Sequence, residues 1–149
     1  MKTLISKITS SNTGLDTLPL RLGAGAIFAA HGAQKLFGWF GGYGLEGTAG
    51  WMASIGLEPG LVMAILAGSA EFFGGLLLIV GLLVRPAAFV LAITMVVAIV
   101  AVHLQNGLFM ANNGYEFGLA LLVVSVALVL RGAGSLSADH LLVAQLAKK

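Results

Sequence analysis

One carboxylate, Glu71, lies near the middle of the long apolar stretch of residues 61–84. Such a stretch matches the roughly 20 residues that a helix needs to cross the hydrocarbon core of a bilayer. A charged side chain at that depth costs roughly 2.5–3.5 kcal/mol on insertion scales. A carboxylate there is rarely idle, so the first question is which other polar side chains can reach it.

Polar side chains that could meet Glu71 lie in the same half of the expected membrane spans, the outer half. His31 and Lys35 are four residues apart and therefore share one face of a helix. At about 1.5 Å of rise per residue, Glu71 lies about 15 Å and His31 about 9 Å from the outer side of the membrane, where the first span ends and the second begins. We expect a polar pocket there, whose candidate ligand-binding residues are His31, Gln34, Lys35, Glu71, His103, Tyr115 and Glu116.

The chemistry expected of this pocket is the binding of a small lipophilic or anionic ligand. Lys35 and His31 would contact a carbonyl or anionic group, and Glu71 and Glu116 would balance charge or pass a proton. The competing interpretation is that Glu71 is protonated, because burial raises a carboxyl pKa, and only joins two helices by hydrogen bonds. His103 and Glu116 at helix ends can equally be explained by interfacial solvation.

The two histidines among these residues raise the question of a metal or haem site. His31 and His103 come from different apolar stretches, and two histidines can ligate a haem between helices. Their spacing matches no ligand signature, however, so we predict no metal site and disfavour haem. A quinone is a candidate ligand, and no catalytic residue or cofactor is assigned.

The elements that position these residues are predicted to be four membrane-spanning helices. The chain is 58% hydrophobic and 9% charged, against about 25% charged in soluble domains. We predict an all-α membrane protein, a single domain over residues 1–149 that forms an up-down four-helix transmembrane bundle. The expected spans cover residues 18–37, 61–84, 87–104 and 115–130, with amphipathic tails at both ends of the chain.

The first connection, residues 38–60, is rich in glycine and aromatic residues, which suit the membrane–water interface. Thr48 is predicted to cap a short interfacial helix over residues 49–55, and a lid over a site is the alternative role. Within the spans, small residues such as Gly25 and Gly75 allow close approach between helices, and they would permit a homodimer without demanding one.

The orientation follows from the basic residues, because cytoplasmic loops carry an excess of lysine and arginine. Arg21 and Arg85 are interpreted as topology residues. One side holds Lys2, Lys7, Arg21, Arg85, Arg131, Lys148 and Lys149, whereas the other holds only Lys35. Both termini should therefore be cytoplasmic, in the inner membrane of a bacterium.

Several functions are excluded or weakened by composition. The chain has no cysteine, which excludes thiol chemistry and cysteine-ligated clusters within it. A net charge of +2 is too small to indicate nucleic-acid binding. The predicted partners are the lipid bilayer, a membrane or periplasmic redox protein, and a second copy of the chain.

An ordered set of short motifs resembles the DoxX family of small bacterial membrane proteins. The carrying segments are Arg21, residues 31–37 (HGAQKLF), the linker GWMASIGLEPG, Glu71 with the following FFGGLLL, residues 81–88 (GLLVRPAA), residues 113–116 (NGYE) and residues 132–137 (GAGSLS). The resemblance covers roughly residues 18–139 and implies a four-helix inner-membrane protein. It also implies that Arg21, His31, Gln34, Lys35, Glu71, Tyr115 and Glu116 matter.

The family resemblance does not imply one activity. Members of the family are linked to quinone-dependent sulfur oxidation or to thiol and superoxide defence, and here any thiol would have to come from a partner. Our leading hypothesis is a membrane subunit of a redox system with a ligand pocket. If it is redox-linked, we expect a quinone-associated oxidoreductase subunit rather than a complete enzyme. The alternatives are a non-catalytic anchor or assembly protein and a small-solute or proton-coupled transporter.

Overall fold

The structure is a computed structural model that describes residues 14–147. The described chain is helical throughout and contains no strand. The expected tail over residues 1–14 therefore lies almost entirely outside it. Six α-helices are present: α2 (Leu18–Phe37), α3 (Gly44–Ser54), α4 (Gly60–Val80), α5 (Val84–Ala98), α6 (Glu116–Arg131) and α7 (Ala138–Ala147).

Shorter helical segments join these helices. The 3₁₀ turn η1 (Trp39–Gly41) follows α2, and the π-helical turn η2 (Ile99–His103) extends α5. The 3₁₀ turns η3 (Leu104–Asn106) and η4 (Met110–Asn112) lead to α6. The continuous stretch Val84–Asn106 and α4 are the two helical stretches of the described chain that are long and apolar enough to cross a membrane.

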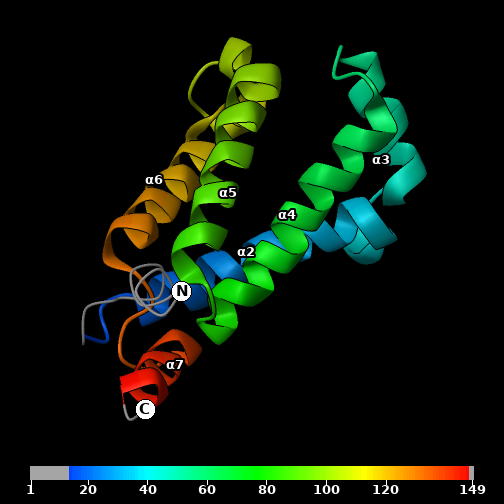
Figure 1. The fold of residues 1–149 in the computed structure, drawn as a ribbon. Coiled ribbons are helices and arrows are strands. Elements are labelled where there is room, and N and C mark those ends of the chain that lie inside the picture. Colours follow the sequence, from blue (N-terminus) through cyan, green and yellow to red (C-terminus); the bar gives the residue numbers. More distant parts are fainter. Residues whose placement is uncertain (1–13, 148–149) are drawn as a thin grey trace.

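The main helices form two pairs (Figure 1). The helix α2 packs along α4, and α5 packs along α6. The helices α4 and α5 meet at the turn that joins them and diverge toward their other ends. The start of α2 and the helix α7 lie at the end of the molecule that holds this turn, whereas α3 and the connection between α5 and α6 lie at the other end.

The helix boundaries correct two of the predicted ranges. The helix α4 stops at Val80 because Gly81 adopts a left-handed conformation, with a φ of 74°, which glycine adopts without strain. Val84 therefore begins α5 instead of ending α4. Pro86 lies in the first turn of α5, where its missing N–H removes no helical hydrogen bond.

The helix in the first connection is longer than predicted. It begins at Gly44, so Thr48 lies inside α3 and does not cap it. The Thr48 hydroxyl instead donates a 3.4 Å hydrogen bond to the Lys35 carbonyl oxygen, which ties α3 to the end of α2.

The core lies between the two helix pairs, nearer the end that holds the α4–α5 turn. Its largest apolar side chains are Phe28, Leu78, Leu91 and Leu128, each at most 1% exposed. Most other large apolar side chains on α4 and α5 face outward, as expected for helices whose outer faces contact lipid.

Candidate functional site

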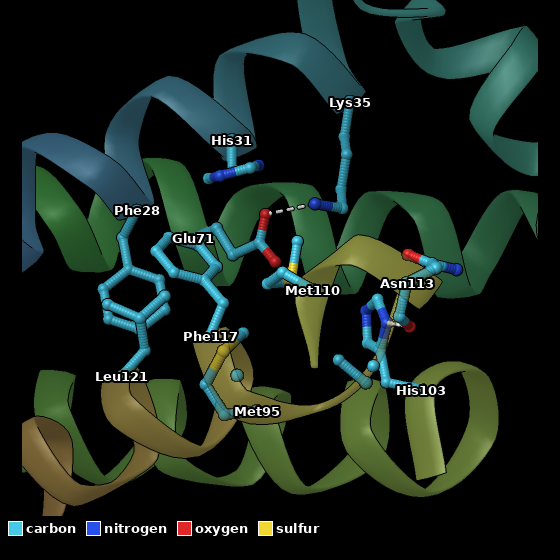
Figure 2. Close-up of a pocket in the computed structure, with 13 residues that line it drawn as sticks. Phe28, His31, Lys35, Glu71, Met95, His103, Met110, Asn113, Phe117 and Leu121 are labelled. Carbon is cyan, nitrogen blue, oxygen red and sulfur yellow. Dashed lines mark hydrogen bonds and ion pairs between the residues drawn. The ribbon is translucent and has the colours of Figure 1, made fainter. Parts of the chain in front are cut away.

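An ion pair joins the two helices of the first pair. Lys35 near the end of α2 and Glu71 in the middle of α4 lie with Nζ and Oε2 2.6 Å apart (Figure 2). The Glu71 side chain is 5% exposed and the Lys35 side chain 24%. Charges this buried need a partner, and the predicted meeting of these two residues is found.

Close packing of α2 on α4 brings the Lys35 and Glu71 side chains within hydrogen-bonding distance. Gly32 lies against the backbone of Phe72, and a Cβ atom on Gly32 would lie 2.7 Å from the Phe72 Cα atom. A Cβ atom on Gly75 would lie 2.5 Å from the amide nitrogen of Ala29. The small residues predicted to allow close approach thus pack within the chain, and a homodimer would have to use another surface.

The ion pair lies on the wall of a cavity of about 280 Å³. All four long helices and the connection between α5 and α6 contribute to it. The lining residues are Phe28, His31, Lys35, Glu71, Met95, Ala98, His103, Met110, Asn113, Gly114, Phe117, Gly118 and Leu121. The cavity therefore has a charged wall on α2 and α4 and a mostly apolar wall on α5 and α6.

His31 lies one helical turn before Lys35 and lines the same cavity. Its ring faces the ring of Phe117 on α6, with the ring centres 6.1 Å apart (Figure 2). His31 also forms a side-chain hydrogen bond with Gln34, which leaves one of its two ring nitrogens for a ligand in the cavity.

His103 lines the cavity from the π-helical turn η2. Its Nδ1 atom lies 2.9 Å from the carbonyl oxygen of Asn113. Because a carbonyl oxygen only accepts, Nδ1 carries the proton in this contact. One ring nitrogen is thus used to hold the connection between α5 and α6, and Nε2 remains for another partner.

Glu116 and Tyr115 do not line the cavity. The Glu116 carboxylate accepts a 2.7 Å hydrogen bond from the amide of Met110. The Tyr115 amide donates to the carbonyl oxygen of Gly107 over 3.0 Å. Both residues thus stabilise the connection between α5 and α6. This connection lines part of the cavity, so Glu116 and Tyr115 can influence the cavity by positioning it.

Gln34 does not line the cavity. Its side-chain amide donates to the Phe40 carbonyl oxygen over 3.3 Å. It lines a separate hollow of about 280 Å³ on the other side of Lys35, together with Tyr43 and Trp51. Lys35 therefore lies between two hollows, of which only one contains Glu71.

The two arginines singled out in the sequence lie at the opposite end of the molecule. The buried Arg21 guanidinium donates to the carbonyl oxygens of Leu78 and Leu136, over 3.1 and 2.5 Å. Arg85 donates to the Val129 carbonyl oxygen over 2.7 Å. Both arginines are thus hydrogen-bonded to backbone at this end, whatever they contribute to orientation.

An acidic residue of the final helix, Asp139, also belongs to this end. It does not cap its own helix, because Ser137 caps α7 by accepting from the His140 amide over 3.1 Å. The Asp139 carboxylate instead accepts from the amides of Leu83 and Val84, over 2.8 and 3.0 Å. It caps α5, and it is only 1% exposed.

Residues that sequence reasoning missed are mainly the apolar walls of the cavity. Phe28, Met95, Met110 and Phe117 carry no polar signal, and only the arrangement of the helices identifies them as lining residues. Within residues 14–147, no three histidine, cysteine, aspartate or glutamate side chains are grouped so that they could hold a metal ion.

Comparison with known proteins supplies a family. The DoxX family model matches residues 17–104. A Bacillus subtilis (strain 168) protein named "Putative oxidoreductase CatD" is 37% identical over 125 residues, which cover 84% of this chain and 85% of that protein. Two Haemophilus influenzae proteins, each named "Uncharacterized protein", are 30% and 32% identical over 91% and 81% of this chain and 89% and 86% of their own lengths. No solved structure matches.

Proposed function

The chain belongs to the DoxX family, and we propose that it is a small integral membrane subunit of a redox system that binds a quinone in the cavity beside Glu71. The observation that carries this proposal is the Lys35–Glu71 ion pair on the wall of that cavity. The similarity to a protein named an oxidoreductase supports a redox setting.

In this proposal the cavity supplies donors for a ligand carbonyl. Lys35 has three ammonium hydrogens and donates one of them to Glu71. The others can donate to a quinone oxygen, and His31 offers a second donor from the same face of α2. Phe28, Phe117 and Met95 provide an apolar surface for the ring, as is usual in sites for small ligands.

The proposed reaction is the reduction of a quinone to a quinol, and it requires this chain and a second protein. A quinone becomes a quinol by taking two electrons and two protons. The electrons would come from a membrane-bound or periplasmic reductase, because this chain has no cysteine to carry them. Lys35, held as an ammonium by the Glu71 carboxylate, would deliver one proton to a ring oxygen and regain it from water on the outer side, and a second proton taken up from that water would reach the other ring oxygen.

The membrane arrangement proposed here has four spans. A helix rises about 1.5 Å per residue, so α2 and α4 each extend about 30 Å and α6 about 24 Å. Arg21, Arg85 and Arg131 lie at the end of the molecule where α4 meets α5. We place this end in the cytoplasm of a bacterium, which puts the cavity in the outer half of the inner membrane.

The transporter alternative is disfavoured by what lies beyond the cavity. Between it and the cytoplasmic end are Leu78, Leu91 and Leu128, which are fully buried and apolar. A solute or a proton would need a continuous polar path there, whereas the buried Ser125 hydroxyl on α6 donates to the Leu121 carbonyl oxygen of its own helix over 2.8 Å. The anchor alternative is separated from ligand binding by the experiment below.

The experiment measures quinone binding to the purified protein in lipid nanodiscs. The probe is a decyl-substituted benzoquinone, and binding is followed by quenching of the protein's 2 tryptophans. Loss of a charge-assisted hydrogen bond in Lys35→Met should weaken binding roughly tenfold or more. Glu71→Gln should also weaken it, because the substitution removes the carboxylate that orients Lys35.

The matched control is Glu46→Gln, which changes an exposed carboxylate on α3 in the same way. It should bind the probe as the unchanged protein does. Equal binding by all three variants would refute the assignment of the cavity. If the unchanged protein binds no quinone and another membrane protein co-purifies with it in a constant ratio, the anchor role is favoured.

A further inference from the structure

Another hollow lies where α4 meets α5, on the side of these two helices that does not line the cavity. It is an apolar groove of about 300 Å³. It is lined by Met52, Leu57, Met63, Leu66, Ala67, Ala70, Val90, Ile93, Thr94 and Val97. Thr94 is the polar member of this set, and its hydroxyl already donates to the Val90 carbonyl oxygen over 3.0 Å. The groove therefore suits hydrocarbon.

The groove and the polar cavity share the same two helices at the same height. On α4, Ala70 lines the groove and the next residue, Glu71, lines the cavity. On α5, Thr94 lines the groove and the next residue, Met95, lines the cavity. Adjacent helical residues point about 100° apart, so the two hollows lie on either side of one seam between α4 and α5.

The contact between α4 and α5 is tightly filled near the turn that joins them, and toward the other end it is made by small side chains. Toward the α4–α5 turn, the Leu91 side chain fills the space at Gly74, lying 3.1 Å from where a Cβ atom would be. Toward the outer end, the residues beside the seam include Ala67, Ala70 and Ala98, whose side chains are single methyl groups. The helices also diverge in this direction (Figure 1).

We propose that the groove holds the hydrocarbon tail of the same ligand whose polar ring lies beside Glu71. The ligand class is then an amphiphile with one redox ring and a long unbranched or isoprenoid tail, which passes between α4 and α5 above Leu91. This inference rests on the proposed function. A tail-less molecule would fill the cavity and leave the groove to lipid.

The test compares two probes with the same ring, a dimethoxy-methyl-benzoquinone and its decyl derivative, in nanodiscs of one lipid. Ala70→Phe fills the groove, and Ala67→Phe does so from a second position in case the first variant folds poorly. The control is Ala92→Phe, which fills a different apolar groove between α5 and α6, also lined by Leu122 and Val126.

A phenyl ring in the tail site should weaken binding of the decyl probe roughly tenfold, because overfilled apolar sites exclude their occupant. Binding of the tail-less probe should change less than about twofold, and Ala92→Phe should leave both probes unaffected. The unchanged protein should bind the decyl probe more tightly than the tail-less probe. Equal affinities for the two probes would overturn the tail site, and so would equal losses of affinity for both probes in Ala70→Phe and Ala67→Phe.

The outcomes also separate this inference from the proposed function. If neither probe binds the unchanged protein, the quinone assignment fails and the tail site fails with it. If both bind equally and lose affinity only in Lys35→Met, the cavity assignment stands and the tail site is refuted. A change of oligomeric state in Ala70→Phe, with both affinities intact, would make the groove an interface between copies and would also refute the tail site.

Discussion

Replacing Gly32 by alanine should force α2 and α4 apart. The added Cβ atom would lie 2.7 Å from the Phe72 Cα atom and 2.7 Å from its Cβ atom, whereas carbon atoms pack at about 3.5–4 Å. The helices must therefore separate by roughly 1 Å at this point. Overfilled contacts of this kind typically cost about 1–3 kcal/mol of unfolding free energy.

The control for this prediction is Gly23→Ala on the same helix, because a Cβ atom there would meet nothing within 4 Å. Both substitutions gain the same helix propensity, about 1 kcal/mol, so the difference between them isolates the steric clash. The assay is thermal unfolding in one detergent, followed by chromatography of the soluble fraction. Gly32→Ala should unfold at the lower temperature.

The same variant should disturb the ligand site, because Lys35 lies one turn after Gly32 and its 2.6 Å contact with Glu71 depends on the helix spacing. Binding of the decyl quinone should weaken in Gly32→Ala and stay unchanged in Gly23→Ala. Equal unfolding temperatures for the two variants would refute the close contact of α2 with Phe72 and the reasoning built on it.

Two further predictions concern the opposite end of the molecule. Asp139→Ala should lower the unfolding free energy by about 1–2 kcal/mol, as loss of a helix cap does, because it leaves the Leu83 and Val84 amides without their acceptor; Asp139→Asn, which keeps one acceptor, should lose less in the same thermal assay. The hydrogen bond from Arg131 holds the pKa of Asp16 below its usual 3.8, so its contribution to stability is complete above about pH 4 and is lost as the pH falls through the lowered value. Asp16→Asn should remove that part of the acid dependence, and an unchanged profile would contradict it.

The part of the site that could be predicted from sequence follows from helical geometry. His31 and Lys35 are four residues apart, and Glu71 is the carboxylate of an otherwise apolar helix, so their common depth followed from counting residues. The structure brings all three to one cavity. The expected first helix, residues 18–37, was also confirmed, because Gly38 ends it with a φ of 72°.

The part that could not be predicted depends on contacts between distant segments. Glu116 has a depth similar to His103, but its carboxylate turns to the Met110 amide within the local connection. The start of α5 at Val84 is stabilised by Asp139, which lies 55 residues further along the chain. A sequence reading that considers one helix at a time has no means of finding such a partner. The available signal was a single carboxylate, Asp139, at the start of an otherwise apolar tail.

The cap on α5 also bears on the order in which the protein can be assembled during synthesis. The ribosome makes α4, α5 and α6 before it makes Asp139. Until then, the first amides of α5 must bond to water or lipid headgroups, and the turn between α4 and α5 lacks its final partner. The hairpin of α4 and α5 can enter the membrane early, but its turn is completed only after residue 139 folds back onto it. If the growing chain were released or stalled before this residue, the helices would be present but the turn between α4 and α5 would lack the Asp139 carboxylate that holds it.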